Sequence, residues 1–249
     1  MRYTPWLRVP TFVLIASLLV AMLAACGGDD DDDASSDASP TVVETAASVL
    51  EQAAAAWNKT NSAHFALAIT GDAFLDNDES IRLVSAEGDI ARPSLVEASA
   101  KIDVMVLTAD IDLISADGQM YITGLVSDKW TKAPDDFSYD PSVLFSESDG
   151  IAAILTGLQD ATLDGRESVE GKTAYKVTGT ATAEQVDAVS AGSIIGSAIA
   201  VTVWVSTETQ DVLRVTLAEP SDARATPATW DLSLGKHDEP VVIETPVIE

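Results

Sequence analysis

Apolar and polar residues alternate with a period of two along much of the chain after residue 64. The segment 98–106 places Ala, Ile or Val at every second position through 106, with Ser, Lys and Asp among the residues between them. The segments 65–69 and 109–113 show the same period. Successive side chains of a β-strand point to opposite faces, so this pattern predicts antiparallel strands with one apolar and one solvated face.

Short polar segments separate these strands and predict tight turns at 76–78, 87–89 and 117–118. Further strands are expected over 172–180, 199–206, 212–218 and 229–234. Helical spacing of apolar residues predicts helices over 41–58 and 151–165, and 182–191 is a third helix candidate. Pro141 suits the first turn of a short helix over 142–145. Thr41 is the expected cap of the first helix, with Glu44 three residues on. The fold class is therefore α+β, with a long antiparallel sheet and a few helices gathered on one face.

The apolar face of this sheet carries many medium-sized aliphatic residues, whereas the helices that would cover it are few and rich in Ala. A curved sheet that is covered incompletely leaves an apolar hollow, and a normally packed core is the alternative. The residues expected to line a hollow are Leu67, Ile69, Ile102, Val104, Ile111, Leu113, Ile122, Ile154, Leu158, Val203 and Val215. Four tryptophans are also considered as pocket residues, although core packing is the commoner role: Trp57, Trp130, Trp204 and Trp230.

The N-terminus has the pattern of a secretory leader. Arg2 and Arg8 precede an uncharged run over 11–25, which is shorter than the roughly 20 residues of a membrane span. The run ends in Leu-Ala-Ala followed by Cys26, which resembles a bacterial lipobox. The resemblance implies cleavage before Cys26 and a lipid on its sulfur, which would anchor the protein to the outer face of the cell membrane. An ordinary secretory signal with an accidental Cys is the alternative.

Five successive aspartates lie just after Cys26. Like charges that repel one another and bury nothing predict a disordered tether. The predicted organisation is a signal peptide over 1–25, a lipidated acidic tether over 26–40 and a single domain over 41–249.

The chain carries 14 Lys and Arg against 40 Asp and Glu, a net charge of −26. This balance argues against binding to nucleic acid and against simple adhesion to anionic membranes. With two His and one Cys, we expect no His/Cys metal site and no intramolecular disulfide. The segment 76–87 faintly resembles a calcium loop but has Ile81 where that loop needs Gly. No nucleophile-elbow or phosphate-loop motif occurs, so we expect no enzyme and no cofactor.

Several short motifs occur in an order that resembles one protein family. After the lipobox they lie at 62–65, 85–89, 128–131, 139–142, 165–167, 177–180, 202–205 and 239–241. Together they are similar to the LppX/LprA/LprF/LprG lipoproteins over roughly residues 42–245. The resemblance implies a strongly curved half-barrel sheet, similar to the LolA/LolB carriers, with helices on its concave face. It also implies an apolar cavity that holds the acyl chains of lipids or glycolipids, and an envelope lipid transporter as a candidate partner.

Three functions follow from these observations. The leading one is a membrane-anchored carrier of acylated lipids or glycolipids across or within the cell envelope. A structural or regulatory envelope module with a filled core is the second. A carrier of lipoproteins is the third, and an anchor on Cys26 argues against a freely shuttling protein of that kind.

Overall fold

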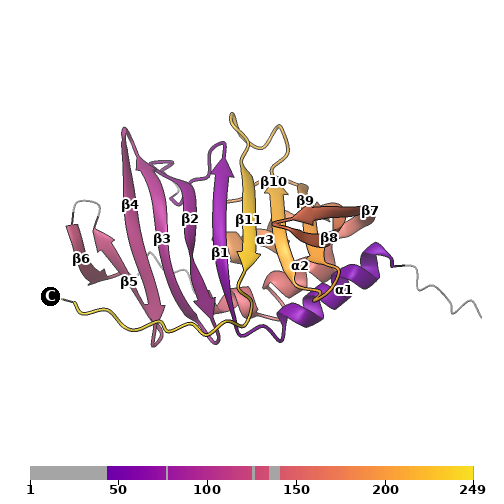
Figure 1. The fold of residues 1–249 in the computed structure, drawn as a ribbon. Helices are drawn as coiled ribbons and strands as arrows, with labels where there is room; N and C mark the ends of the chain where they lie inside the picture. The colour runs from indigo at the N-terminus through magenta and orange to yellow at the C-terminus, as the bar shows by residue number, and fades with distance from the viewer. Residues whose placement is uncertain (1–43, 77, 125–126, 135–140, 249) are drawn as a thin grey trace, which may run out of the picture. The chain divides into compact units, whose positions relative to one another are not determined.

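The computed structural model describes residues 44–76, 78–124, 127–134 and 141–248, which belong to one compact unit. The described residues form eleven strands in one antiparallel sheet, with the order β6-β5-β4-β3-β2-β1-β11-β10-β9-β8-β7 (Figure 1). The sheet is open, because β6 and β7 form its two edges. The expected α+β class with a large antiparallel sheet is confirmed. The predicted leader, Cys26 and the acidic tether lie outside the described residues.

Neighbouring strands are mostly consecutive in the chain, so short hairpins build the sheet as two meanders that meet where β1 pairs with β11. The strands are β1 Ser62–Thr70, β2 Ile81–Ala91, β3 Leu95–Val104, β4 Leu107–Ala116, β5 Gln119–Gly124, β6 Ser127–Lys132, β7 Gln159–Val169, β8 Lys172–Ala181, β9 Ile199–Ser206, β10 Val212–Ala218 and β11 Thr229–Gly235.

Three α-helices and one 3-10 helix lie in the described residues: α1 Ala46–Trp57, η1 Pro141–Phe145, α2 Ile151–Gly157 and α3 Ala183–Ser190. The predicted start of α1 is wrong, because its N-cap is Thr45. The Thr45 hydroxyl accepts a hydrogen bond from the Ser48 amide, and the Ser48 hydroxyl accepts one from the Thr45 amide. Thr182 caps α3 in the same reciprocal way with Gln185, which satisfies amides that a helix start leaves open.

Two predictions about the strands are wrong for physical reasons. The expected turn at 87–89 lies inside β2, and the chain turns at 92–94 instead. Position 88 requires Gly because β3 passes close to the backbone of β2 at this point. A Cβ on Gly88 would lie 2.1 Å from the Glu97 carbonyl oxygen. The strand predicted through 106 ends at Val104, because Met105 and Val106 form a turn that no Gly, Asn or Asp marks.

The helix predicted to run to about 165 ends at Gly157, where Leu158 already has an extended backbone. The segment that follows is β7, which pairs with β8 at the edge of the sheet. Most of its residues are exposed, so it lacks the apolar alternation by which strands are recognised.

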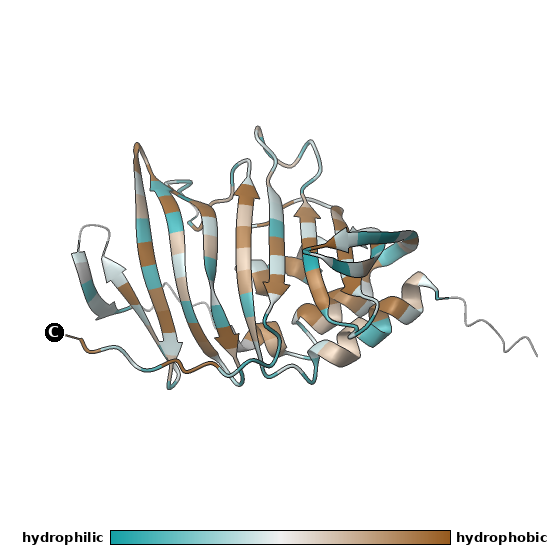
Figure 2. Cartoon of the chain, viewed as in Figure 1, coloured by the Kyte–Doolittle hydropathy of each residue, from teal (hydrophilic) through white to brown (hydrophobic). Residues whose placement is uncertain are grey.

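Most of the large apolar side chains of the strands belong to one core cluster with residues of α2 and α3, which lie behind the sheet in Figure 1. Helix α1 packs on α2 and contacts β7, β8 and β9. Brown and teal bands alternate along the strands in Figure 2, as the two-residue period predicts. Among the described residues, no helix has the length and apolar character needed to cross a bilayer.

Candidate functional site

An apolar cavity of about 580 Å³ lies between the sheet and the helices. Strands β1 to β5 and β9 to β11 form one wall, and η1, α2 and the end of α3 with its following loop form the other. The lining residues are Phe65, Leu67, Leu75, Leu83, Ala86, Ile90, Val96, Ala98, Ala100, Ile111, Leu113, Met120, Leu144, Ile151, Ile154, Leu155, Val189, Ser190, Ala191, Ile194, Val201, Val203, Val215, Leu217, Trp230, Leu232 and Leu234.

The lining is almost entirely hydrocarbon. Among these described residues none is charged, and Ser190 and Trp230 are the two whose side chains carry an O–H or N–H group. The Ser190 hydroxyl donates to the Asp187 carbonyl at 3.4 Å, whereas the buried Trp230 Nε1 has no hydrogen-bond partner within the described part of the chain. A site of this kind binds hydrocarbon chains through burial rather than through directional bonds.

The alternation in each strand produces this lining directly. In β1, Phe65 and Leu67 face the cavity, while Ala66 and Ala68 face a groove on the opposite side of the sheet. That outer side carries ion pairs, and its aliphatic residues, such as Ile114 and Leu213, belong to small separate clusters. Lys101 pairs with Asp110 at 2.6 Å, and the Arg214 Nε donates to Asp231 at 2.7 Å.

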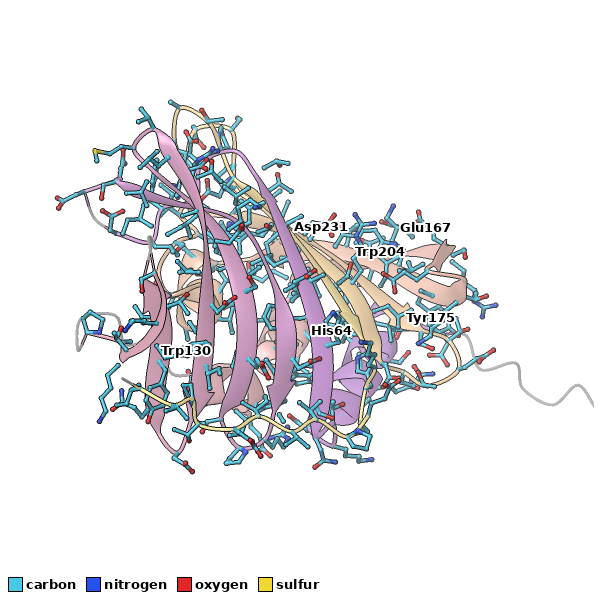
Figure 3. The ribbon with its side chains drawn as sticks, turned by 60° about the vertical axis from the view of Figure 1, so that its left-hand side comes forward. His64, Trp130, Glu167, Tyr175, Trp204 and Asp231 are labelled. Carbon is cyan, nitrogen blue, oxygen red and sulfur yellow. The ribbon has the colours of Figure 1, made fainter. Side chains whose placement is uncertain are left out.

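A second polar cluster lies on the outer side of β7, β8 and β9 (Figure 3). Glu167 accepts hydrogen bonds from the Trp204 indole N–H and from Lys176, each at 2.9 Å. These two bonds, that from Trp204 foremost, hold the pKa of Glu167 below its usual value. Arg214 lies 5.1 Å from the centre of the Trp204 ring, a cation–π distance. Charge is thus kept on the face that does not line the cavity.

The helical wall of the cavity rests on a tightly packed layer. Trp57 of α1 stacks on Phe145 of η1 with ring centres 5.5 Å apart, and its Nε1 donates to the Leu144 carbonyl at 3.0 Å. The Leu144 side chain lines the cavity. Helix α1 therefore fixes the position of a segment that forms part of the wall.

A buried ion pair fixes the loop that follows α3. The Glu219 side chain is fully buried and accepts hydrogen bonds from Arg224 at 2.7 Å and from the Ile195 amide at 2.9 Å. Arg224 also donates to the Ser193 carbonyl at 3.0 Å, and Ile194 lines the cavity. This pair could not be predicted from the sequence, because a Glu and an Arg five residues apart in a polar loop form no recognisable pattern.

Six of the eleven predicted lining residues lie at the cavity: Leu67, Ile111, Leu113, Ile154, Val203 and Val215. The other five, Ile69, Ile102, Val104, Ile122 and Leu158, do not border it. Ile102 and Val104 share a face of β3 with the lining residues Ala98 and Ala100 but lie nearer the end of the strand. The two-residue period predicts the face, and the position of the helices limits how far the cavity extends. Lipid binding by any of these residues stays a prediction.

Of the four tryptophans considered, Trp230 lines the cavity and the other three do not. Trp57 packs in the helical layer, and Trp204 belongs to the outer polar cluster. Trp130 packs against a small separate cluster of Ile114, Ala116 and Ile243 (Figure 3).

The family described as LppX_LprAFG lipoprotein matches residues 45–243, which include all the elements that form the cavity. The chain belongs to this family. Lipoprotein LprA of Mycobacterium tuberculosis is 28% identical over 189 residues, which cover 73% of this chain and 75% of LprA. The lipoarabinomannan carrier protein LprG of Mycolicibacterium hassiacum is 27% identical over 210 residues, which cover 83% and 86% of the two chains.

Two solved structures of LppX/LprAFG lipoproteins have the same fold. LprF of Mycobacterium bovis superposes with a TM-score of 0.65 at 19% identity and covers 81% of this chain and 96% of LprF. LppX of M. tuberculosis gives 0.58 at 21% identity and covers 80% and 98%. The family that the ordered motifs indicated is thereby confirmed, together with an α+β fold built on a large antiparallel sheet, whereas the strong half-barrel curvature and the likeness to LolA and LolB stay predictions.

Proposed function

We propose that this LppX/LprAFG lipoprotein is a carrier that binds acylated lipids or glycolipids with their acyl chains in the cavity. The observation that carries the proposal is the cavity itself, which is about 580 Å³ in volume and has no charged group among its described lining residues. Each methylene moved from water into such a lining contributes about 0.8 kcal/mol, so long acyl chains bind without specific polar contacts. The name of the relative LprG, a lipoarabinomannan carrier protein, supports the same class of cargo.

The head group of such a lipid would remain at the rim of the cavity or in water, because a sugar or phosphate has no partners among aliphatic side chains. Selectivity then depends on the volume of the cavity and on polar groups near its border. None of the described lining residues is charged, so the cavity offers no carboxylate or ammonium group for acid–base chemistry, and we propose a binding role and not a catalytic one. An envelope lipid transporter is a proposed partner, and nucleic acid is not.

The proposal also includes a lipid anchor on Cys26, which would hold the protein on the outer face of the cell membrane. The lipobox-like Leu-Ala-Ala-Cys sequence supports it. Changing Cys26 to Ala should release the protein from membranes or block its maturation. The measurement is partition of the full chain into detergent, and a variant that still partitions like the wild type would show that acylation is not the anchor.

The carrier function is tested by native mass spectrometry of the full chain purified from its own host. A co-purified acylated lipid is expected, and it should be reduced in Leu113→Gln, which places an amide in the cavity wall. Asp112→Asn is the matched control, because the neighbouring side chain points to the other face of β4. Absence of lipid from the wild type would favour the second function, a structural or regulatory envelope module.

A further inference from the structure

The turn between β3 and β4 exposes three aliphatic side chains in a row. Met105 is 85% exposed, Val106 94% and Leu107 68%, and the turn is a brown tip at one end of the sheet in Figure 2. Scattered exposed aliphatic residues are ordinary, but three consecutive ones at the tip of a hairpin form a continuous apolar surface. No other part of the described sheet has such a cluster among its large exposed hydrophobic residues.

The backbone of this turn is unfavourable for Met105, the first of its two central residues. Val104 pairs with Leu107, so Met105 and Val106 are the two central residues of a hairpin turn. Met105 has a φ of 55°, in a region where Gly, Asn and Asp are favoured and a long side chain costs free energy. The tip thus combines backbone strain with exposed apolar surface. Transfer of these side chains out of water would offset both costs.

A strip of apolar side chains connects the tip with the cavity. Ala100 of β3 and Ile111 of β4 are paired lining residues of the cavity. The next pairs on the same face are Ile102 with Ala109 and Val104 with Leu107. Four residues of a strand span about 13 Å, so the strip bridges roughly that distance between the cavity wall and the exposed tip.

The polar groups beside the tip are already paired with one another. Asp103 accepts a hydrogen bond from the Thr108 hydroxyl at 2.6 Å and forms an ion pair with Arg82. Lys101 pairs with Asp110 on the same side of the sheet. The tip therefore ends in apolar side chains, and the charged residues that border it form ion pairs with one another. Such a surface suits the interface of a bilayer of neutral lipids and offers little attraction to anionic head groups.

We propose that the β3–β4 tip inserts into a bilayer of neutral lipids and that the strip passes acyl chains between the bilayer and the cavity. Protein-binding surfaces are enriched in Trp, Tyr and Arg, none of which is at the tip, whereas aliphatic side chains need only hydrocarbon around them. The inference rests on the proposed carrier function and adds to it the route by which the lipid enters and leaves.

Insertion is tested on the full chain reconstituted in phosphatidylcholine vesicles. An NBD fluorophore is attached to Val106→Cys or, as the control, to the exposed Glu208→Cys in the turn between β9 and β10. Because β3 and β10 run in the same direction in this antiparallel sheet, the turn that precedes β10 lies at the end of the sheet opposite to the tip. Nitroxide-labelled lipids should quench the label at 106 and not that at 208. Equal quenching at both positions, or none at 106, would overturn the proposal.

The transfer route is tested with the double variant Met105→Gly and Val106→Asn, which places Gly at the central turn residue that has a positive φ. It removes apolar surface and gives the turn residues that its backbone favours, so the melting temperature should be unchanged or higher. Uptake of a pyrene-labelled diacyl lipid from the vesicles, followed by energy transfer from tryptophan, should slow about tenfold or more, since bilayer contact depends on the buried apolar area. The control removes two exposed valines elsewhere, Val242→Asn with Val247→Asn, and should transfer lipid at the wild-type rate.

The outcomes separate the two proposals. If the wild type binds no pyrene lipid even when the lipid is supplied in detergent micelles, the carrier function fails. If it binds the lipid and the tip variant takes it up from vesicles at the wild-type rate, the carrier function stands and the insertion is wrong. Loss of a dimer in the tip variant, with unchanged uptake, would show instead that the tip contacts a second copy of the chain. When the vesicles contain 30% phosphatidylglycerol, the tip variant should slow lipid uptake less than it does with neutral vesicles, because the chain carries a net charge of −26 and is repelled by an anionic surface.

Discussion

Two neighbouring apolar regions of the molecule differ in how completely they are filled. In the packed region, formed by Val49, Ala53, Trp57 and Phe145, two stacked rings and a closely approaching Ala-rich helix exclude solvent. In the hollow region, formed by the cavity-lining residues of β1 to β4, side chains of similar polarity surround about 580 Å³. Apolar composition alone thus does not decide whether a core is filled. The distance between the facing backbones and the reach of their side chains decide it.

The largest effect that would test this comparison is expected from Trp57→Ala. It removes the stack on Phe145 and leaves the Leu144 carbonyl without its indole donor, so the free energy of unfolding should fall by about 3–5 kcal/mol. Leu113→Ala in the hollow region should lose only about 1–2 kcal/mol, since that side chain already faces open space. Chemical denaturation of both variants measures the difference, and equal losses would show that the hollow region is packed in solution.

Replacing an alanine by a larger residue tests the same comparison by adding volume instead of removing it. Ala53→Leu adds volume to the fully buried face of α1 and should destabilise the protein by about 1–3 kcal/mol. Ala100→Leu adds the same atoms to the cavity, where stability should change by less than about 1 kcal/mol. Binding of a fluorescent acyl lipid should fall in Ala100→Leu. Unchanged binding would place the lipid elsewhere.

Lipid binding should itself stabilise the protein unevenly. A lipid present at 100 times its dissociation constant adds about 2.7 kcal/mol to the free energy of unfolding. Hydrogen exchange should slow most at the amides of β1 to β4, whose side chains would contact the lipid, and least in α1, whose residues are packed without it. Stronger protection of α1 than of these strands would contradict the assignment of the hollow region as the site.

The smallest effect concerns pH, because the charged side chains of the described residues lie outside the cavity lining. Hydrogen bonds from Trp204 and Lys176 lower the pKa of Glu167 from its usual 4.5, so its contribution to stability is complete above that value and is lost as the pH falls through the lowered pKa. Glu167→Gln should therefore flatten the acid side of the stability profile. The affinity for a neutral lipid should stay constant between pH 5 and 8, since no charged residue is among the described lining groups. A titration curve in that range would contradict this.

Much of the sheet could be predicted from local patterns. The strands β9 and β10 have the predicted bounds, and α3 lies within the helix predicted over 182–191. The edge strand β7 could not be predicted, because solvent surrounds most of its side chains and removes the apolar alternation. The turn at Met105 could not be predicted either, since local residue preferences oppose it.

The strand period predicts which face of the sheet lines the cavity, but it does not predict how far along the strands the cavity extends. For Leu67, Ile111 and Val203, the strand period determines on which face of the sheet each side chain lies. Ile102 and Val104 have the same parity but lie beyond the cavity, and the pinning of Ile195 by Glu219 joins residues 24 positions apart. No local pattern encodes such a contact, because the free energy that favours it arises only after the loops on either side of β9 and β10 have come together.

Local sequence patterns specify which residues are apolar, which strand face they occupy and which family the chain resembles. These depend on short-range geometry, namely the two-residue period of strands and the order of local motifs. The tight packing of α1, the open cavity between β1 to β4 and the helices, and the apolar strip that continues to the exposed tip all arise from the tertiary fold. These depend on how far apart separate elements come to rest, which is set by the packing of many residues at once.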